Sequence, residues 1–310
     1  MQIIKHDINI DFVGKRKIAL IISGIVILLG LVSLVVQGGP NLGIDFVGGT
    51  LVQVKFTENT DAAKIKDSLA SLDLGSVVVQ RFGDDPNEFL IRVQESTKEK
   101  DLSGMISASL NTVYGEGMVD LRRVEMVGPQ VGKDLREKGI LSIVYAMIGI
   151  LIYISWRFEL RFAIGAIIAL LHDVMITIGA FSITGREIDL PIIAAFLAII
   201  GYSLNDTIIV YDRIRENYGK HQKKGFGEVV NHSINETLSR TILTSGTTLL
   251  VVLALFVFGG GVIHNFAFAM LVGILVGTYS SIFVASPVLI FWDDYRSRGQ
   301  KKLAAEGGTR

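Results

Sequence analysis

Cysteine is absent from the 310 residues of this chain, and its absence excludes disulfide bonds and cysteine-based metal or redox sites. Charge is also scarce: only 19% of the residues are charged, and 30 basic residues balance 30 acidic ones. Half of the residues are hydrophobic instead. A soluble globular protein rarely has this composition, so the sequence favours a protein embedded in a membrane. Nothing in it indicates a cofactor or a nucleic-acid partner.

The hydrophobic residues are gathered in six blocks. The blocks are 18–36, 139–156, 162–184, 190–211, 241–258 and 266–292, and each contains 18 to 27 residues. A helix needs about 20 apolar residues to span the hydrocarbon core of a bilayer. The first block is longer than the apolar part of a cleaved signal peptide, and no A-x-A cleavage site follows it, so we expect an uncleaved anchor. The sequence predicts a polytopic α-helical membrane protein with six transmembrane helices.

Basic residues indicate the orientation, because short cytoplasmic loops collect Lys and Arg. They cluster in four segments, 1–17, 157–161, 212–240 and 293–310, whereas the short loops 185–189 and 259–265 contain only Arg186. We therefore expect cytoplasmic tails at 1–17 and 293–310, and a cytoplasmic loop 212–240 within the membrane region 139–292. Apolar residues at helical spacing from 226 to 238 predict a helix along the inner membrane surface; the alternative is a plain connecting helix.

Residues 37–138 have ordinary polarity and mixed charge, which predicts a folded extracytoplasmic domain rather than a linker. Apolar periodicity predicts strands at 51–57, 77–82, 88–93 and 118–127, with helices at 61–72 and 102–113 between them. The order strand, helix, strand, strand, helix, strand is that of an α+β ferredoxin-like domain. This fold has many functions, so it predicts no activity by itself.

Two opposite charges lie in the apolar blocks, Asp206 in the fourth and Arg240 at the start of the fifth. An ionised side chain in hydrocarbon costs at least ~2.5 kcal/mol and normally serves an ion pathway or a partner charge. Similar predicted depths make an ion pair feasible, and Thr237, Thr244 and Thr248 continue a polar stripe from Arg240 that would face the bundle interior. The alternative interpretations are that Arg240 snorkels to the interface and that Asp206 only holds helices together.

His172 and Asp173 lie near the middle of the third block, where we expect apolar surroundings. We weigh two interpretations equally, a hydrogen-bonded structural pair and a second ionisable step. The tract 43–49 follows the first block directly and contains Gly43, Asp45, Gly48 and Gly49. It lacks the Gly-Lys-Ser/Thr ending of a phosphate loop, and its glycines permit tight turns. We expect it to form the hinge or junction between membrane and domain.

Five tracts carry a resemblance to a known family. They are GIDFVGG at 43–49, VGPQVGKDL at 127–135, ALLHDVMITIGAF at 169–181, GYSLNDTIIVYDRIREN at 201–217 and SINETLSRTILTSGTTLL at 233–250. With these tracts in this order, the chain resembles the SecD/SecF family of protein-export membrane proteins, relatives of the resistance-nodulation-division transporters. The likeness covers nearly the whole length, and long tracts of this kind are far more specific than a lone glycine pattern.

The resemblance implies a non-enzymatic subunit of the bacterial inner membrane. Such a subunit works with SecD beside the SecY, SecE and SecG channel, with YajC as a further candidate partner, and uses the proton-motive force in late steps of protein export. In that family an Asp in the fourth span and an Arg at the head of the fifth line the proton path, which here are Asp206 and Arg240. The outer domain is implicated in a conformational cycle and in contact with the emerging polypeptide.

Three alternatives come from other classes of protein. An intramembrane aspartyl protease would use Asp173 and Asp206 as a dyad, but the Gly-x-Gly-Asp signature is missing, since Leu204 and Asn205 precede Asp206. A small-molecule or lipid exporter of the same superfamily usually needs two large domains and twelve spans. A structural scaffold would stabilise its partners and would tolerate neutralisation of Asp206.

Overall fold

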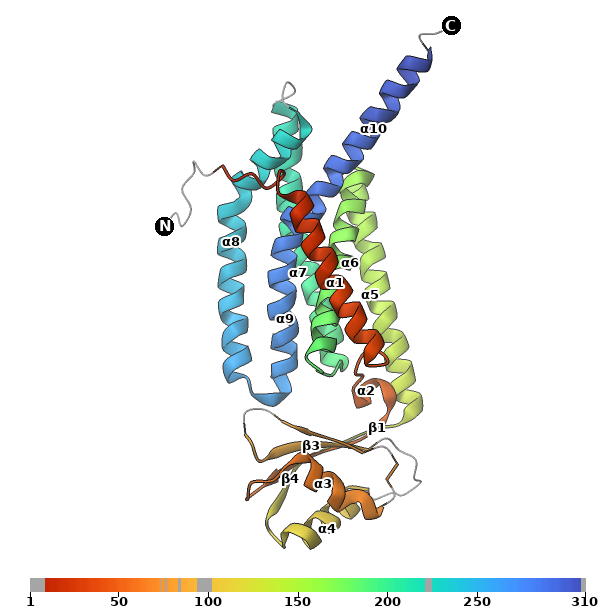
Figure 1. Cartoon of the computed structure of the whole chain (residues 1–310), viewed down its shortest axis with the longest axis vertical. Coiled ribbons are helices and arrows are strands. Elements are labelled where there is room, and N and C mark those ends of the chain that lie inside the picture. The colour runs from red at the N-terminus through yellow and green to blue at the C-terminus, as the bar shows by residue number, and fades with distance from the viewer. Residues whose placement is uncertain are drawn as a thin grey trace.

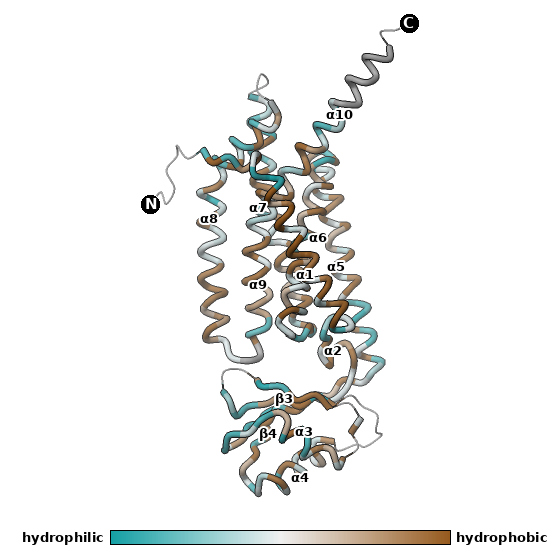
Figure 2. The backbone as a smooth tube through the Cα atoms, in the orientation of Figure 1, coloured by the Kyte–Doolittle hydropathy of each residue, from teal (hydrophilic) through white to brown (hydrophobic). Residues whose placement is uncertain are grey.

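The computed structural model describes residues 9–72, 74–75, 77–82, 85–93, 102–220 and 225–307. A bundle of long helices stands on a small sheet domain, and both chain termini lie at the far end of the bundle (Figure 1). We call these two ends the domain end and the terminal end. Hydrophobic residues run along the bundle helices, while hydrophilic ones gather at both ends (Figure 2). Within the described residues, six helices are long and apolar enough to cross a membrane, as predicted.

The bundle helices extend beyond the predicted blocks. They are α1 (Arg16–Val36), α5 (Pro129–Arg157), α6 (Leu160–Ile183), α7 (Leu190–Lys220), α8 (Phe226–Phe258), α9 (Gly260–Ser280), the π-helical turn η2 (Ser281–Ala285) and α10 (Ser286–Gly307). The last three form one continuous sixth span. Its helix runs on past residue 292, so the stretch expected as a tail begins as helix.

Two expected boundaries differ from the structure. Residues 129–138 were expected in the outer domain, but they are the first turns of α5, because Pro129 occupies the first turn, where its missing N–H costs nothing. The expected loop 212–240 is mostly helix, since α7 continues to Lys220 and α8 starts at Phe226. The helix predicted over 226–238 is present, but it is continuous with the fifth apolar block, since α8 runs from Phe226 to Phe258.

The sheet domain has the predicted order of elements. Its elements are α2 (Ile44–Val47), β1 (Gly49–Phe56), α3 (Ala62–Leu69), the 3-10 turn η1 (Ala70–Leu72), β2 (Val77–Arg81), β3 (Glu88–Val93), α4 (Leu102–Tyr114) and β4 (Val119–Val127). The four strands form an antiparallel sheet in the order β2-β3-β1-β4. Alternate residues such as Val52, Val54 and Phe89 pack with Ile65 and Ile106 of the helices, so α3 and α4 cover one face. The other face looks toward the bundle (Figure 1).

Helix α1 packs against α6 through a pair of glycines. A Cβ placed on Gly30 would lie 2.8 Å from the Cα of Gly179, and the reverse distance is 2.9 Å. Only glycines at both positions allow this close approach, which is the small-residue packing common among transmembrane helices. Ser33 and Ser182 add a hydrogen bond of 2.8 Å between the same two helices. Helix α1, which leads to the sheet domain, is thus fastened along α6.

Candidate functional site

Asp206 is buried in the bundle between α7 and α8. Its side chain is 1% exposed, and its Oδ2 accepts a hydrogen bond of 3.2 Å from Ser245 Oγ on α8. Thr278 on α9 donates in turn to Ser245 over 2.8 Å. The second carboxylate oxygen, Oδ1, is buried without a hydrogen-bond partner among the described residues. A buried acceptor without a partner is costly, so the ionised carboxylate of Asp206 is poorly satisfied by the described residues.

Arg240 does not meet Asp206 in the structure. Arg240 is exposed, and no ion pair joins it to any described residue. Of the predicted stripe of Thr237, Arg240, Thr244 and Thr248, only Thr237 belongs to the buried polar face of α8. That face continues through Thr241 and Ser245, one residue beyond Arg240 and Thr244. One residue is a rotation of about 100° around a helix, which is enough to turn Arg240 outward.

His172 and Asp173 form the centre of a second polar cluster, and the apolar surroundings expected for them are wrong. His172 Nδ1 lies 2.9 Å from Asp173 Oδ1, and both side chains are buried. Asp173 Oδ2 accepts hydrogen bonds from Ser203 on α7, over 2.6 Å, and from Ser280 on α9, over 2.8 Å. His172 Nε2 lies 3.0 Å from Ser23 Oγ on α1. The pair therefore connects four helices.

The two clusters meet on α9. Thr278 belongs to the Asp206 cluster, while Tyr279 and Ser280 belong to the His172–Asp173 cluster, and the π-helical turn η2 follows them directly. Single-turn π-helical insertions occur frequently at functional sites. Gly277 allows the approach of α7, because a Cβ there would lie 2.9 Å from that of Ser203. Asp173 and Asp206 share no hydrogen bond, so they do not form the dyad of an aspartyl protease.

Sequence reasoning missed the hydroxyl groups of these clusters. They are Ser23, Ser203, Ser245, Thr278, Tyr279 and Ser280. The signal available was a hydroxyl residue within an apolar block, but many such residues bond only to their own helix, as Thr247 does to Leu243. Within the described part of the chain, no group of three or more His, Asp or Glu side chains could hold a metal ion.

The tract 43–49 lies between the bundle and the sheet domain, where it contacts the α6–α7 loop. Gly43 N donates to the carbonyl of Ile188 over 2.8 Å, and Asp45 Oδ2 accepts from the backbone N–H of Leu190 over 2.9 Å. Asp45 thereby satisfies a free N–H at the start of α7. Gly48 and Gly49 have positive φ angles of 80° and 126°, which glycine adopts readily. The tract is packed against the α6–α7 loop rather than left free.

An ion pair adds a second set of contacts between the sheet domain and the bundle. Arg92 on β3 forms an ion pair with Glu187 in the α6–α7 loop, and both side chains are mostly buried. A cavity of about 540 Å³ lies between the sheet and this loop, lined in part by Asp45, Arg186 and Asp189. Burial raises the pKa of Asp189 to about 6, and the nearby carboxylate of Asp45 adds to the effect. The loop therefore connects the domain to the bundle through an ion pair, and it also contains a carboxyl group, Asp189, whose charge changes near pH 6.

We expect Asp189→Asn to stabilise the protein at pH 7.5 by about 1 to 3 kcal/mol. Folded Asp189 keeps its proton up to about pH 6, whereas its usual pKa is 3.8. Its contribution to stability is thus full below the usual pKa and is lost as the pH rises through 6. Asn is uncharged at every pH, and its side-chain oxygen can still accept the hydrogen bond from the backbone N–H of Ile192. Thermal unfolding in detergent at pH 7.5 and 4.5 would measure the difference.

The gain from Asp189→Asn should largely vanish at pH 4.5, where Asp189 is protonated in the folded protein. The control is Asp120→Asn, a change to an exposed carboxylate on β4, for which we expect less than about 0.5 kcal/mol at either pH. An equal gain from Asp189→Asn at both pH values would show that charge is not its cause.

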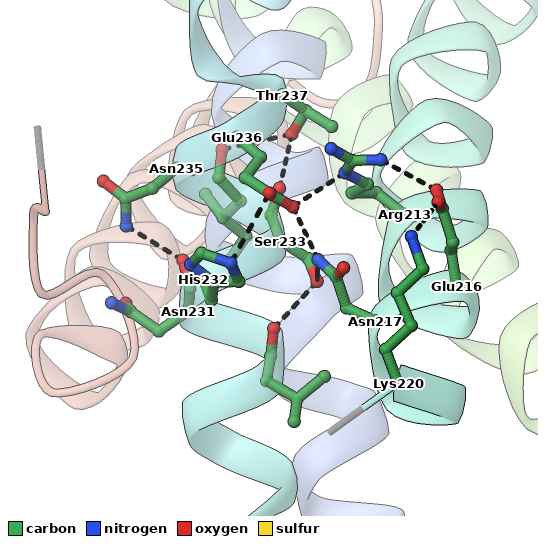
Figure 3. A network of polar contacts seen from close by, with 12 residues as sticks. Arg213, Glu216, Asn217, Lys220, Asn231, His232, Ser233, Asn235, Glu236 and Thr237 are labelled. Carbon is green, nitrogen blue, oxygen red and sulfur yellow. Dashed lines mark hydrogen bonds and ion pairs between the residues drawn. The ribbon is translucent and has the colours of Figure 1, made fainter. Parts of the chain in front are cut away.

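At the terminal end, a polar network joins the extended ends of α7 and α8 (Figure 3). Glu236 Oε2 accepts from Arg213 Nε over 2.7 Å and from Asn217 Nδ2 over 2.6 Å. Asn231 and Asn235, one turn apart on α8, bond to the backbone of the N-terminal segment at Ile10. The N-terminal segment is thus held across the start of α8.

Comparison with known proteins identifies the family. The model described as "Protein export membrane protein SecD/SecF, C-terminal" matches residues 106–295, and the "SecD/SecF GG Motif" model matches residues 32–60. A protein translocase subunit SecF from Magnetococcus marinus is 50% identical over 99% of this chain and 98% of its own length. The SecF of Vibrio alginolyticus is 45% identical over 93% of this chain and 91% of its own.

Solved structures agree with the sequence comparison. The crystal structure of SecDF, a translocon-associated membrane protein from Thermus thermophilus, matches with a TM-score of 0.85 and 35% identity. It covers 94% of this chain, and this chain spans 40% of that longer one. A super-membrane-facing form of SecDF matches with a lower TM-score of 0.69 over 96% of this chain. By its sequence over nearly the full length and by its fold, this chain belongs to the SecD/SecF family of protein-export membrane proteins.

Proposed function

We propose that this chain is a non-catalytic subunit of the Sec protein translocase that works with SecD to complete protein export through the SecY, SecE and SecG channel. Support comes from relatives named translocase subunit SecF that match over nearly their whole length. The SecDF chain of the solved structure is longer, and this chain matches 40% of it. A SecD partner supplies the remainder of the transporter in this proposal, and YajC is a further candidate partner.

The proton-motive force is the energy source in this proposal. The observation that supports it is the environment of Asp206. Asp206 is buried in the bundle with one carboxylate oxygen unpaired, as expected of a group that alternates between protonated and ionised forms. One elementary charge that crosses the membrane gains about 2.3 kcal/mol per 100 mV. Arg240, exposed beside this site, would complete the path after a rotation of α8 or through water. The His172–Asp173 pair is the candidate for a second ionisable step.

The sheet domain would transmit the movement to the exported polypeptide. Its strand order, β2-β3-β1-β4, supports assignment to the ferredoxin-like fold, and we place it on the extracytoplasmic side of the inner membrane with both termini in the cytoplasm. That orientation agrees with the basic residues at the terminal end. The tract of Gly43, Asp45, Gly48 and Gly49 is the proposed junction through which α1 and α5 move the domain.

The test is preprotein export in inverted membrane vesicles whose native subunit is replaced by this chain. We expect SecD to co-purify with the chain, and completion of export to accelerate when a proton gradient is imposed and to slow again with a protonophore. A sodium gradient in place of the proton gradient serves as the control for the coupling ion. Completion at one unchanging rate under all gradients, with the complex intact, would favour the structural scaffold instead.

A further inference from the structure

His172 is the start of a chain of hydrogen bonds that ends on the backbone of α1. Its Nε2 lies 3.0 Å from Ser23 Oγ, and Ser23 Oγ lies 3.1 Å from the hydroxyl of Tyr279. That hydroxyl donates over 2.7 Å to the backbone carbonyl of Ala19. The imidazole of His172 also stacks on the Tyr279 ring, with 6.1 Å between centroids. These hydrogen bonds thus attach two residues of α1, Ala19 and Ser23, to α6 and α9.

The number of protons in this series of hydrogen bonds follows from which groups can donate and which can only accept. A carbonyl oxygen has no proton, so the single hydroxyl proton of Tyr279 lies toward Ala19. The contact between Ser23 and Tyr279 then requires the proton of Ser23. Ser23 has no second proton for His172, so Nε2 must carry one itself. The contact between His172 Nδ1 and Asp173 Oδ1 requires another, so the pair holds two protons.

Both distributions of those two protons satisfy every contact. One is a histidinium beside a carboxylate, and the other is a neutral histidine beside a carboxylic acid. In either case Ser203 and Ser280 donate to the second oxygen of Asp173. The titratable groups that contact His172 are Asp173 on α6 and Tyr279 on α9, while α1 and α7 contribute uncharged serines to the cluster. Asp206 is turned instead toward Ser245.

We propose that the His172–Asp173 pair is a second proton-binding site, and that its second proton sustains one of the three hydrogen bonds in this series that hold α1 against α6 and α9. When the pair releases one proton to water, the Ser23 hydroxyl turns to donate to the bare Nε2. The contact between Ser23 and Tyr279 then joins two oxygens with no proton between them, and it is lost. This inference rests on the proposed function in one respect: α1 leads into the junction, so a weaker attachment of α1 shifts the sheet domain.

Nitrogen-15 NMR of the histidines tests the proton count in the full chain reconstituted with SecD. The signal of His172 is the one that disappears in His172→Gln. At the low end of a pH series, where the pair holds both protons, we expect its Nε2 to be protonated, alone or together with Nδ1. A neutral ring protonated only at Nδ1 throughout the series would overturn the proposal. This measurement needs no variant to be active, and it does not depend on whether the protein drives export.

The attachment of α1 is tested by distances between spin labels, which the absence of cysteine makes straightforward. Labels at Ile18→Cys on α1 and Leu250→Cys on α8 lie at exposed positions. We expect the distance to change with pH in a one-proton transition and to be constant in His172→Gln. Tyr279→Phe and Ser23→Ala should each remove the transition too, whereas His264→Gln, a change to a histidine that contacts Phe256 instead, should preserve it.

The outcomes separate this proposal from the proposed function. A transition that persists in His172→Gln, or a constant distance in the unmodified chain, would overturn the second proton site. If the transition is present but export ignores the proton gradient, the site stands and the motor function fails. If Asp206→Asn abolishes gradient-driven export and leaves the transition unchanged, the two carboxylates bind protons independently and both proposals stand.

Discussion

Asp206→Asn is expected to abolish the acceleration of preprotein export by a proton gradient while the complex with SecD still assembles. Asn has the shape of Asp, and its amide oxygen can accept the hydrogen bond from Ser245, so the packing of α7 against α8 is preserved. It cannot bind or release a proton at neutral pH. One charge that moves through 100 mV supplies about 2.3 kcal/mol, which limits the loss to about 50-fold in rate per proton.

The matched control for Asp206→Asn is Asp212→Asn on the same helix. Asp212 is about half exposed and contacts Arg157 over 3.4 Å, so its neutralisation should change export by less than twofold, because exposed ion pairs contribute little. Export is measured in vesicles with and without a proton gradient, and co-purification of SecD is checked for each variant. Wild-type acceleration in Asp206→Asn, with the complex intact, would make the carboxylate a structural group.

Gly48→Ala is expected to have the largest effect on the junction between bundle and domain. Gly48 has φ 80° and ψ 169°, a region of backbone conformation that is essentially restricted to glycine. The added Cβ would lie 2.8 Å from Pro129 Cα and 3.2 Å from Val127 O, where backbone atoms cannot yield cheaply. We expect a destabilisation of about 2 to 4 kcal/mol. Thermal unfolding, together with proteolysis between β4 and α5, would measure it.

Gly128→Ala is the control for Gly48→Ala, since Gly128 directly precedes Pro129, the residue that Gly48 approaches at the start of α5. Its φ is −67°, and a Cβ there would meet nothing within 4 Å, so a loss below about 1 kcal/mol is expected. If both variants lower the unfolding temperature equally, the positive φ of Gly48 and its contact with Pro129 are not what hold the junction. A selective loss in Gly48→Ala should also reduce export, because α5 and the domain then move separately.

The elements of this protein were predictable from local patterns. The predicted strand 88–93 and the predicted helix start at 102 coincide with β3 and α4, because alternation and helical spacing of apolar residues are properties of a few neighbouring residues. Asp206 was named as a candidate site residue for a similar reason, since the energetic cost of a charge in an apolar block can be recognised without knowing which residues surround it. The predicted stripe on α8 is correct at Thr237 but one residue off at Arg240 and Thr244, because an apolar block with scattered hydroxyls leaves the rotation of its helix undetermined.

The sequence by itself determined the six apolar helices, the order of elements in the sheet domain and the presence of a buried carboxylate, because hydrophobicity and periodicity are properties of short stretches of the chain. Only the tertiary structure decided which groups meet. Asp206 bonds to Ser245 rather than to Arg240, and His172 reaches Ser23 on a helix 149 residues away in the chain. These contacts depend on how each helix is rotated against its neighbours. That rotation is set by close approaches such as Gly30 on Gly179, which involve residues far apart in sequence.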